Sequence, residues 1–168
     1  MTPRTLLRLA GAAAVIGGAL RIAATLAPWL PDPVLIQGAY LTVDVFLLLG
    51  LVGLYAEGAG RLGWIGLVGF VTALIGICVV RSQASFVPDG YVAGAALTGI
   101  GTAILGGRML AERGRPKLGP ALWIAALAIG GIGPMLVGAA GAGAVAGVVF
   151  GLAFILAGAA LARQEAAP

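Results

Sequence analysis

Three charged residues interrupt stretches that are otherwise apolar, and they are the strongest candidates for chemistry in the chain. Arg21 lies in VIGGALRIAATLAPW, Asp44 in AYLTVDVFLLLG and Arg81 in CVVRSQAS. A guanidinium group can bind an anion through two parallel hydrogen bonds, and a carboxylate inside a membrane can carry a proton. If the fold brings these residues together, they would form an anion-leaning or proton-coupled site.

Other reactive groups are scarce. The sequence contains no histidine, one cysteine (Cys78) and one lysine (Lys117). The lack of histidine excludes the usual zinc sites, a His-ligated haem and a Ser-His-Asp triad. There is no nucleophile–base pair, no metal-ligand set and no pair of carboxylates, so we expect neither an enzyme nor a metal or other cofactor.

The composition indicates a membrane protein. Of the 168 residues, 61% are hydrophobic and 10% are charged, whereas a soluble domain carries about 25% charged residues. The length suits one integral membrane domain covering residues 1–168. The net charge of +4 comes from basic residues in short loops and at the ends of apolar runs, so we expect no nucleic-acid partner.

Six segments are long enough to cross a bilayer, which needs about 20 apolar residues per helix. The sequence therefore predicts an all-α, polytopic transmembrane helix bundle. The predicted spans cover residues 6–28, 39–57, 62–83, 90–110, 120–138 and 143–162. Short connections such as AEGAGR and GAAGAG separate them and contain glycine or charge, as helix breaks do.

Basic residues predict the orientation. With the N-terminus in the cytoplasm, eight of the ten basic residues fall on the cytoplasmic side, and only Arg21 and Arg81 lie toward the other side. Trp29, Trp64 and Trp123 are expected near membrane–water boundaries. Both termini are then cytoplasmic. The Ala- and Gly-rich composition resembles that of small multi-pass proteins of the bacterial inner membrane, which is the predicted location.

The three charged residues come to a similar depth in this threading. Arg21 lies about seven residues before the outer end of its span, and Asp44 about five residues after the outer end of the next. We predict that Arg21 and Asp44 face each other, with Gly17 and Gly18 leaving room for the guanidinium group. Arg81 either joins them or extends to the interface alone.

The fifth span contains GGIGP at residues 130–134. Proline removes a backbone donor and glycines weaken the helix, and an interrupted helix can mark a binding site in a membrane protein. We expect Gly130 and Pro134 at the same level as the charged residues. The alternative is that these features fix helix register and have no ligand.

Glycines in the sixth span form a smooth ridge at Gly143, Gly147 and Gly151. Small residues let helices approach closely in lipid, so the ridge predicts either packing inside the bundle or a contact with another chain.

We favour a helix-packing subunit or interaction protein in contact with the lipid bilayer. Its partner would be a second copy or another membrane protein. The alternative is a small-molecule or ion transporter or channel that uses Arg21, Asp44 and Arg81.

Overall fold

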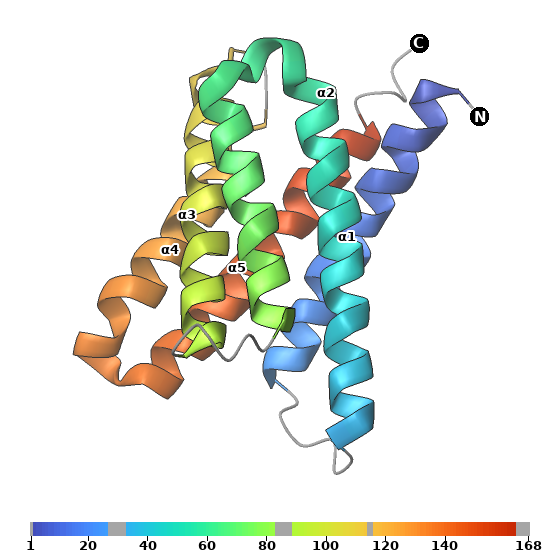
Figure 1. Cartoon of the computed structure of the whole chain (residues 1–168). Helices are drawn as coiled ribbons and strands as arrows, with labels where there is room; N and C mark the ends of the chain where they lie inside the picture. Colours follow the sequence, from blue (N-terminus) through green and yellow to red (C-terminus); the bar gives the residue numbers. More distant parts are fainter. Residues whose placement is uncertain (1, 27–32, 83–88, 114–115, 164–168) are drawn as a thin grey trace.

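The fold is entirely helical over the residues that the computed structural model describes, which are 2–26, 33–82, 89–113 and 116–163. Figure 1 shows the five helices. They are α1 (Pro3–Leu26), α2 (Pro33–Ser82), α3 (Gly90–Ala111), α4 (Leu118–Val137) and α5 (Ala139–Arg163). Each is long and apolar enough to cross a membrane. The prediction of an all-α bundle of apolar helices is therefore confirmed.

Helix α2 folds back on itself at Gly63, where φ is 61° and ψ is −165°. In Figure 1 its first arm rises to this turn and its second arm descends from it. The predicted spans 39–57 and 62–83 are thus two arms of one element. The predicted break at AEGAGR was wrong, because residues 56–61 are helical. One residue in the left-handed region, which glycine adopts without steric cost, suffices for the reversal.

A second glycine turn joins α4 to α5. Gly138 has φ 81° and ψ 156°, and α5 begins directly at Ala139. The predicted connection GAAGAG at residues 138–143 was therefore too long, since residues 139–143 already belong to the helix. Such close connections make the joined helices antiparallel neighbours.

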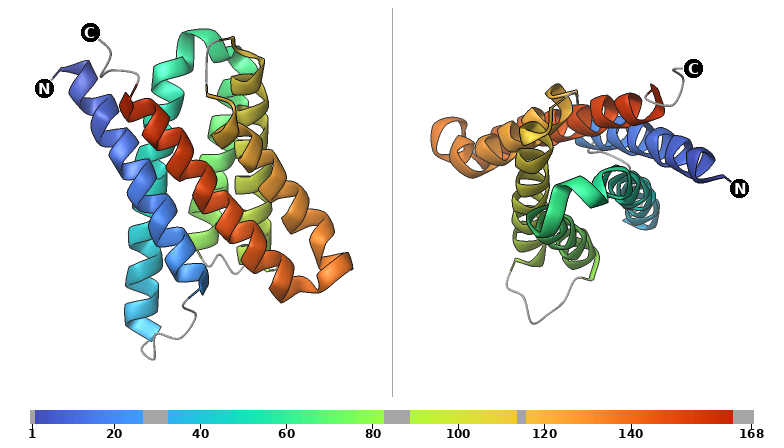
Figure 2. Two further views of the ribbon diagram at one scale, coloured as in Figure 1. Left: turned by 180° about the vertical axis from the view of Figure 1, so that it is seen from behind. Right: turned by 90° about the horizontal axis from the view of Figure 1, so that it is seen from above.

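The helices pack in a ring. Helix α1 contacts α2 and α5, α3 contacts α2 and α4, and α5 contacts α4 and, less extensively, α2; within the described residues α4 contacts neither α1 nor α2. Figure 2 shows α1 and α5 side by side, with the start of α1 and the end of α5 at the same end of the bundle. The turn at Gly63 lies at that end as well (Figure 1).

Large apolar side chains fill the bundle toward that end. Trp123 and Phe154 are fully buried and pack edge to face, with ring centroids 5.1 Å apart. Leu51, Leu62 and Leu105 are also fully buried. Trp123 therefore lies inside the bundle, and its ring is not on the outer surface where an interfacial tryptophan would lie. Trp64, next to the turn of α2, is 75% exposed, while Trp29 falls outside the described residues.

Glycines bring the backbones of α1 and α5 into contact at two places. A Cβ atom on Gly158 would lie 2.6 Å from the carbonyl oxygen of Gly11, and one on Gly151 would lie 2.6 Å from that of Gly18. Helices α2 and α3 meet in the same way at Gly76 and Gly94, where the added Cβ atoms would lie 2.7 and 2.8 Å from the opposite carbonyl oxygen. Such contact is how helices gain van der Waals energy in lipid.

Candidate functional site

Asp44 and Arg81 form an ion pair between the two arms of α2. The Nε–H group of Arg81 donates a hydrogen bond to Oδ2 of Asp44. The two side chains are 14% (Asp44) and 25% (Arg81) exposed. The Arg81 guanidinium also lies over the ring of Tyr40, with its Cζ atom 5.4 Å from the ring centroid, within the range of a cation–π contact.

The turn of α2 explains why these residues meet. Asp44 precedes Gly63 by 19 residues (63 − 44), and Arg81 follows it by 18 (81 − 63). At about 1.5 Å per residue, both lie roughly 27–29 Å from the turn along their own arm. Tyr40 is one helical turn before Asp44 and so projects from the same face. A hairpin that closes at Gly63 thus places all three side chains at one level.

Arg21 approaches this pair from α1. We had predicted Arg21 as the partner of Asp44, but the ion pair of Asp44 is with Arg81. The ion pairs of the described residues involve Arg61 and Arg81. The charge of Arg21 nonetheless acts on the Asp44 carboxylate, alongside that of Arg81. Arg21 and Asp44 are thus close in space, but Arg81 lies opposite Asp44 in the α2 hairpin and forms the ion pair with it.

The packing of α1 on α2 shows where Arg21 lies. A Cβ atom on Gly50 would meet the Cβ of Ala14 at 2.6 Å, and one on Gly17 would meet the backbone nitrogen of Leu47 at 2.8 Å. The two helices are antiparallel, so one further turn places Arg21 opposite residue 43. Its Cα therefore lies beside Asp44, and the half-buried Arg21 side chain starts from the face of α1 that packs on α2.

Gly130 and Pro134 lie apart from the charged residues. Both belong to α4, which continues through Pro134 to Val137. Since α4 contacts only α3 and α5 in the described part of the chain, the expected convergence with Arg21 and Asp44 does not form. A Cβ atom on Gly130 would meet only Ala146 of α5, at 3.6 Å. Gly130 therefore faces α5.

The glycine ridge of α5 has two kinds of surroundings. A Cβ atom on Gly147 would lie 2.8 Å from the Thr25 hydroxyl, and Gly151 packs on Gly18, so both face α1. Gly143 has no atom within 4 Å of an added Cβ. Packing inside the bundle therefore accounts for two of the three glycines.

A second charged cluster ties the turn of α2 to the end of α3. Arg61 lies 2.7 Å from Glu57 and 3.7 Å from Glu112, and Arg108 donates to the backbone oxygen of Leu62 at 3.3 Å. Glu57 and Arg61 lie four residues apart on one helix, so their pairing is local. The part played by Glu112 was missed, because the fold-back of α2 toward α3 is needed to place it there.

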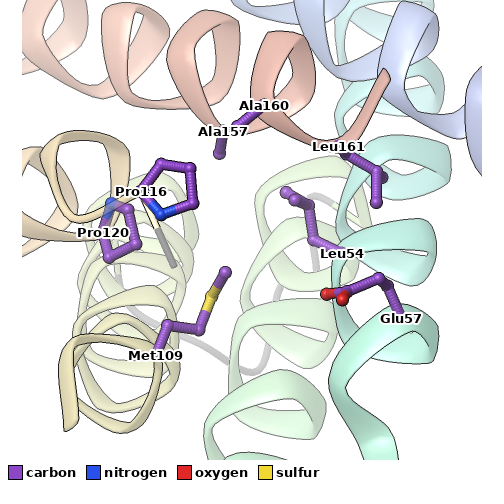
Figure 3. A pocket seen from close by; sticks show the side chains of 8 residues that line it. All are labelled: Leu54, Glu57, Met109, Pro116, Pro120, Ala157, Ala160 and Leu161. Atoms are coloured by element: carbon purple, nitrogen blue, oxygen red, sulfur yellow. The ribbon is translucent and has the colours of Figure 1, made fainter. Parts of the chain in front are cut away.

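A small cavity of about 20 Å³ lies beside this cluster, enough for about one water molecule. Figure 3 shows the Glu57 carboxylate directed into it among apolar side chains. The lining residues are Leu54, Glu57, Met109, Pro116, Pro120, Ala157, Ala160 and Leu161. This cavity is at the end of the bundle near the Gly63 turn, far from Asp44 and Arg81.

The sequence matches no protein-family model, and it shows no significant similarity to a curated protein or to a solved structure.

Proposed function

We propose that this chain is a six-pass protein of the bacterial inner membrane, with both termini in the cytoplasm, that acts as a helix-packing subunit or interaction protein. The two arms of α2 supply two of the six crossings. The basic residues support this orientation. Most of them lie near the Gly63 turn or at the helix ends on that side of the bundle, whereas only Arg21 and Arg81 lie toward the other side.

The observation that carries this proposal is the closed pairing of Asp44 with Arg81. Asp44 is the only carboxylate well inside an apolar span, and its charge is met by a residue of the same helix hairpin. The buried hydroxyls of Thr98 and Thr102 likewise donate to carbonyl oxygens in the preceding turn, at 2.8 and 2.9 Å. These groups stabilise the bundle and do not point to a reaction.

The outer surface of the bundle supports contact with lipid or other membrane helices. Met135 is 87% exposed and Leu136 is 78% exposed near the end of α4, and Gly143 lies open on the neighbouring α5. The end of the bundle where α4 joins α5 extends away from α1 and α2 (Figure 1). An apolar, partly smooth surface of this kind suits close packing against a neighbouring transmembrane helix.

The transporter hypothesis is the second candidate, since two arginines and one aspartate gather at one level. It needs Asp44 to exchange protons or release a bound ion during a cycle. The direct bond from Arg81 opposes this, because protonation of Asp44 would leave Arg81 without its ion-pair partner. We therefore rank the interaction protein first.

Cysteine crosslinking in native membranes tests the proposed function. Cys78 is exposed and would be replaced by serine first. Gly143→Cys and Met135→Cys should then give intermolecular products, whereas Ala153→Cys, which is fully buried, should give none. A chain that stays monomeric from both exposed positions and purifies alone in mild detergent would contradict the proposal.

A further inference from the structure

The cluster around Asp44 has an excess of positive charge. It holds two guanidinium groups, Arg21 and Arg81, and one carboxylate, Asp44. Because Arg81 donates a hydrogen bond directly to Asp44, it largely neutralises the charge of that carboxylate. Within the described residues, the Arg21 side chain takes part in no ion pair. The half-buried Arg21 carries five N–H donors, which favour an anionic acceptor in such a place.

The position of Arg21 along α1 limits what that acceptor can be. Arg21 lies five residues before Leu26, where α1 ends, or about 7.5 Å along the helix axis. Arg81 lies one residue before the end of α2 at the same end of the bundle. The arginine side chain can extend over this distance. Extended toward that end, the guanidinium group would approach the level at which lipid headgroups begin if the chain spans a bilayer.

The surroundings of the cluster favour a lipid over a soluble anion. On α2, Leu41 is 54% exposed and Val45 is 46% exposed, and they flank Asp44 in the sequence. On α1, Leu26 is 64% exposed. Acyl chains would cover such apolar side chains, while the phosphate of the same lipid would meet the charge beside them.

We propose that Arg21 binds the phosphate group of an anionic lipid at the end of the bundle away from the termini, with Arg81 held in place beside it by Asp44. The geometry of the guanidinium group suits a bidentate contact with two phosphate oxygens. This inference rests on the proposed insertion of the chain in a bilayer, and it names lipid as one partner of the interaction protein.

Nanodiscs of defined composition test the inference. Wild-type protein and the variants Arg21→Gln and Arg8→Gln would be placed in phosphatidylcholine alone, in phosphatidylcholine with phosphatidylglycerol, and in phosphatidylcholine with added inorganic phosphate. Arg8→Gln is the matched control, because it removes the same charge from the exposed, opposite end of the same helix. The readouts are the melting temperature and the lipid retained on the protein by native mass spectrometry.

Phosphatidylglycerol should raise the melting temperature of the wild type and of Arg8→Gln, and both should retain it. In Arg21→Gln the gain should disappear, and retention should weaken about tenfold, as expected for the loss of a charged hydrogen bond. Should Arg21→Gln fold poorly, Arg21→Lys keeps the charge but not the bidentate contact, and intermediate retention is expected.

Equal retention by Arg21→Gln and the wild type would overturn the inference, as would a wild type without preference for the anionic lipid. Stabilisation by inorganic phosphate alone would overturn the assignment to lipid and leave a site for soluble phosphate. Failure of the proposed function gives a different result: loss of intermolecular crosslinks contradicts the interaction protein, and release of the chain from membranes at alkaline pH contradicts membrane insertion.

Discussion

The Asp44 carboxylate accepts a hydrogen bond from Nε of Arg81 across the two arms of α2, at nearly equal distances from the turn at Gly63. An ion pair in lipid fixes the register of a hairpin, because a slip of one residue would separate the charges in a medium that solvates them poorly. The pair and the turn therefore define one unit.

The turn at Gly63 should depend on glycine. Alanine at this position would have to adopt a φ of 61° and a ψ of −165°, so Gly63→Ala should cost about 1–3 kcal/mol of stability. Gly60→Ala is the matched control, because Gly60 is helical and an added Cβ meets nothing within 4 Å. Thermal unfolding in detergent measures both. Equal stabilities of the two variants would contradict a turn set by the conformation of Gly63.

The contact between α1 and α5 should depend on Gly151. A Cβ atom there would lie 2.6 Å from the Gly18 carbonyl oxygen and 2.6 Å from Cγ1 of Ile22, so the helices must separate. We expect Gly151→Ala to lower stability by about 1–3 kcal/mol. Gly143→Ala, made in the same ridge at an open position, should be neutral or stabilising by up to about 1 kcal/mol. Thermal unfolding in detergent compares the two variants. If Gly143→Ala were less stable than Gly151→Ala, this packing of α1 on α5 would be contradicted.

Much of the fold was predictable because length and hydropathy identify apolar helices directly. Helix α3 begins at Gly90, as predicted, and ends one residue past the predicted boundary. The α2 turn was placed too early, since AEGAGR contains the usual helix-breaking signals. The helix nevertheless continues through these residues to Gly63, where one residue at positive φ reverses it.

The candidate site was predicted less well than the fold. Depth along the spans brought Arg21, Asp44 and Arg81 to one level, but depth does not say which helices are neighbours around the ring. The partner of Asp44 could have been found by counting from Gly63, where the intervals of 19 and 18 residues match. Gly130 and Pro134 do not join the cluster for the same reason, since α4 contacts neither α1 nor α2 within the described residues.

The six-crossing topology predicts opposite accessibility for the turn and the beginning of α2. In a Cys78→Ser background, Ala59→Cys should react with a membrane-impermeant maleimide only from the cytoplasmic side. Leu35→Cys, which is 59% exposed, should react from the opposite side, as should Val92→Cys at the start of α3. Labelling intact and opened cells compares the positions. Reaction of Ala59→Cys and Leu35→Cys from the same side would contradict the threading.

The most direct measurement is a double-mutant cycle on Asp44 and Arg81, read as the free energy of unfolding of Asp44→Asn, Arg81→Gln and the combined variant. We predict a coupling energy of about 1–3 kcal/mol, below the value for a fully buried pair because the side chains keep 14% and 25% exposure. The same cycle with Arg21→Gln in place of Arg81→Gln should give a clearly smaller coupling. Stronger coupling of Asp44 to Arg21 than to Arg81, or a stability that Asp44→Asn leaves unchanged, would contradict a structural ion pair that closes the α2 hairpin.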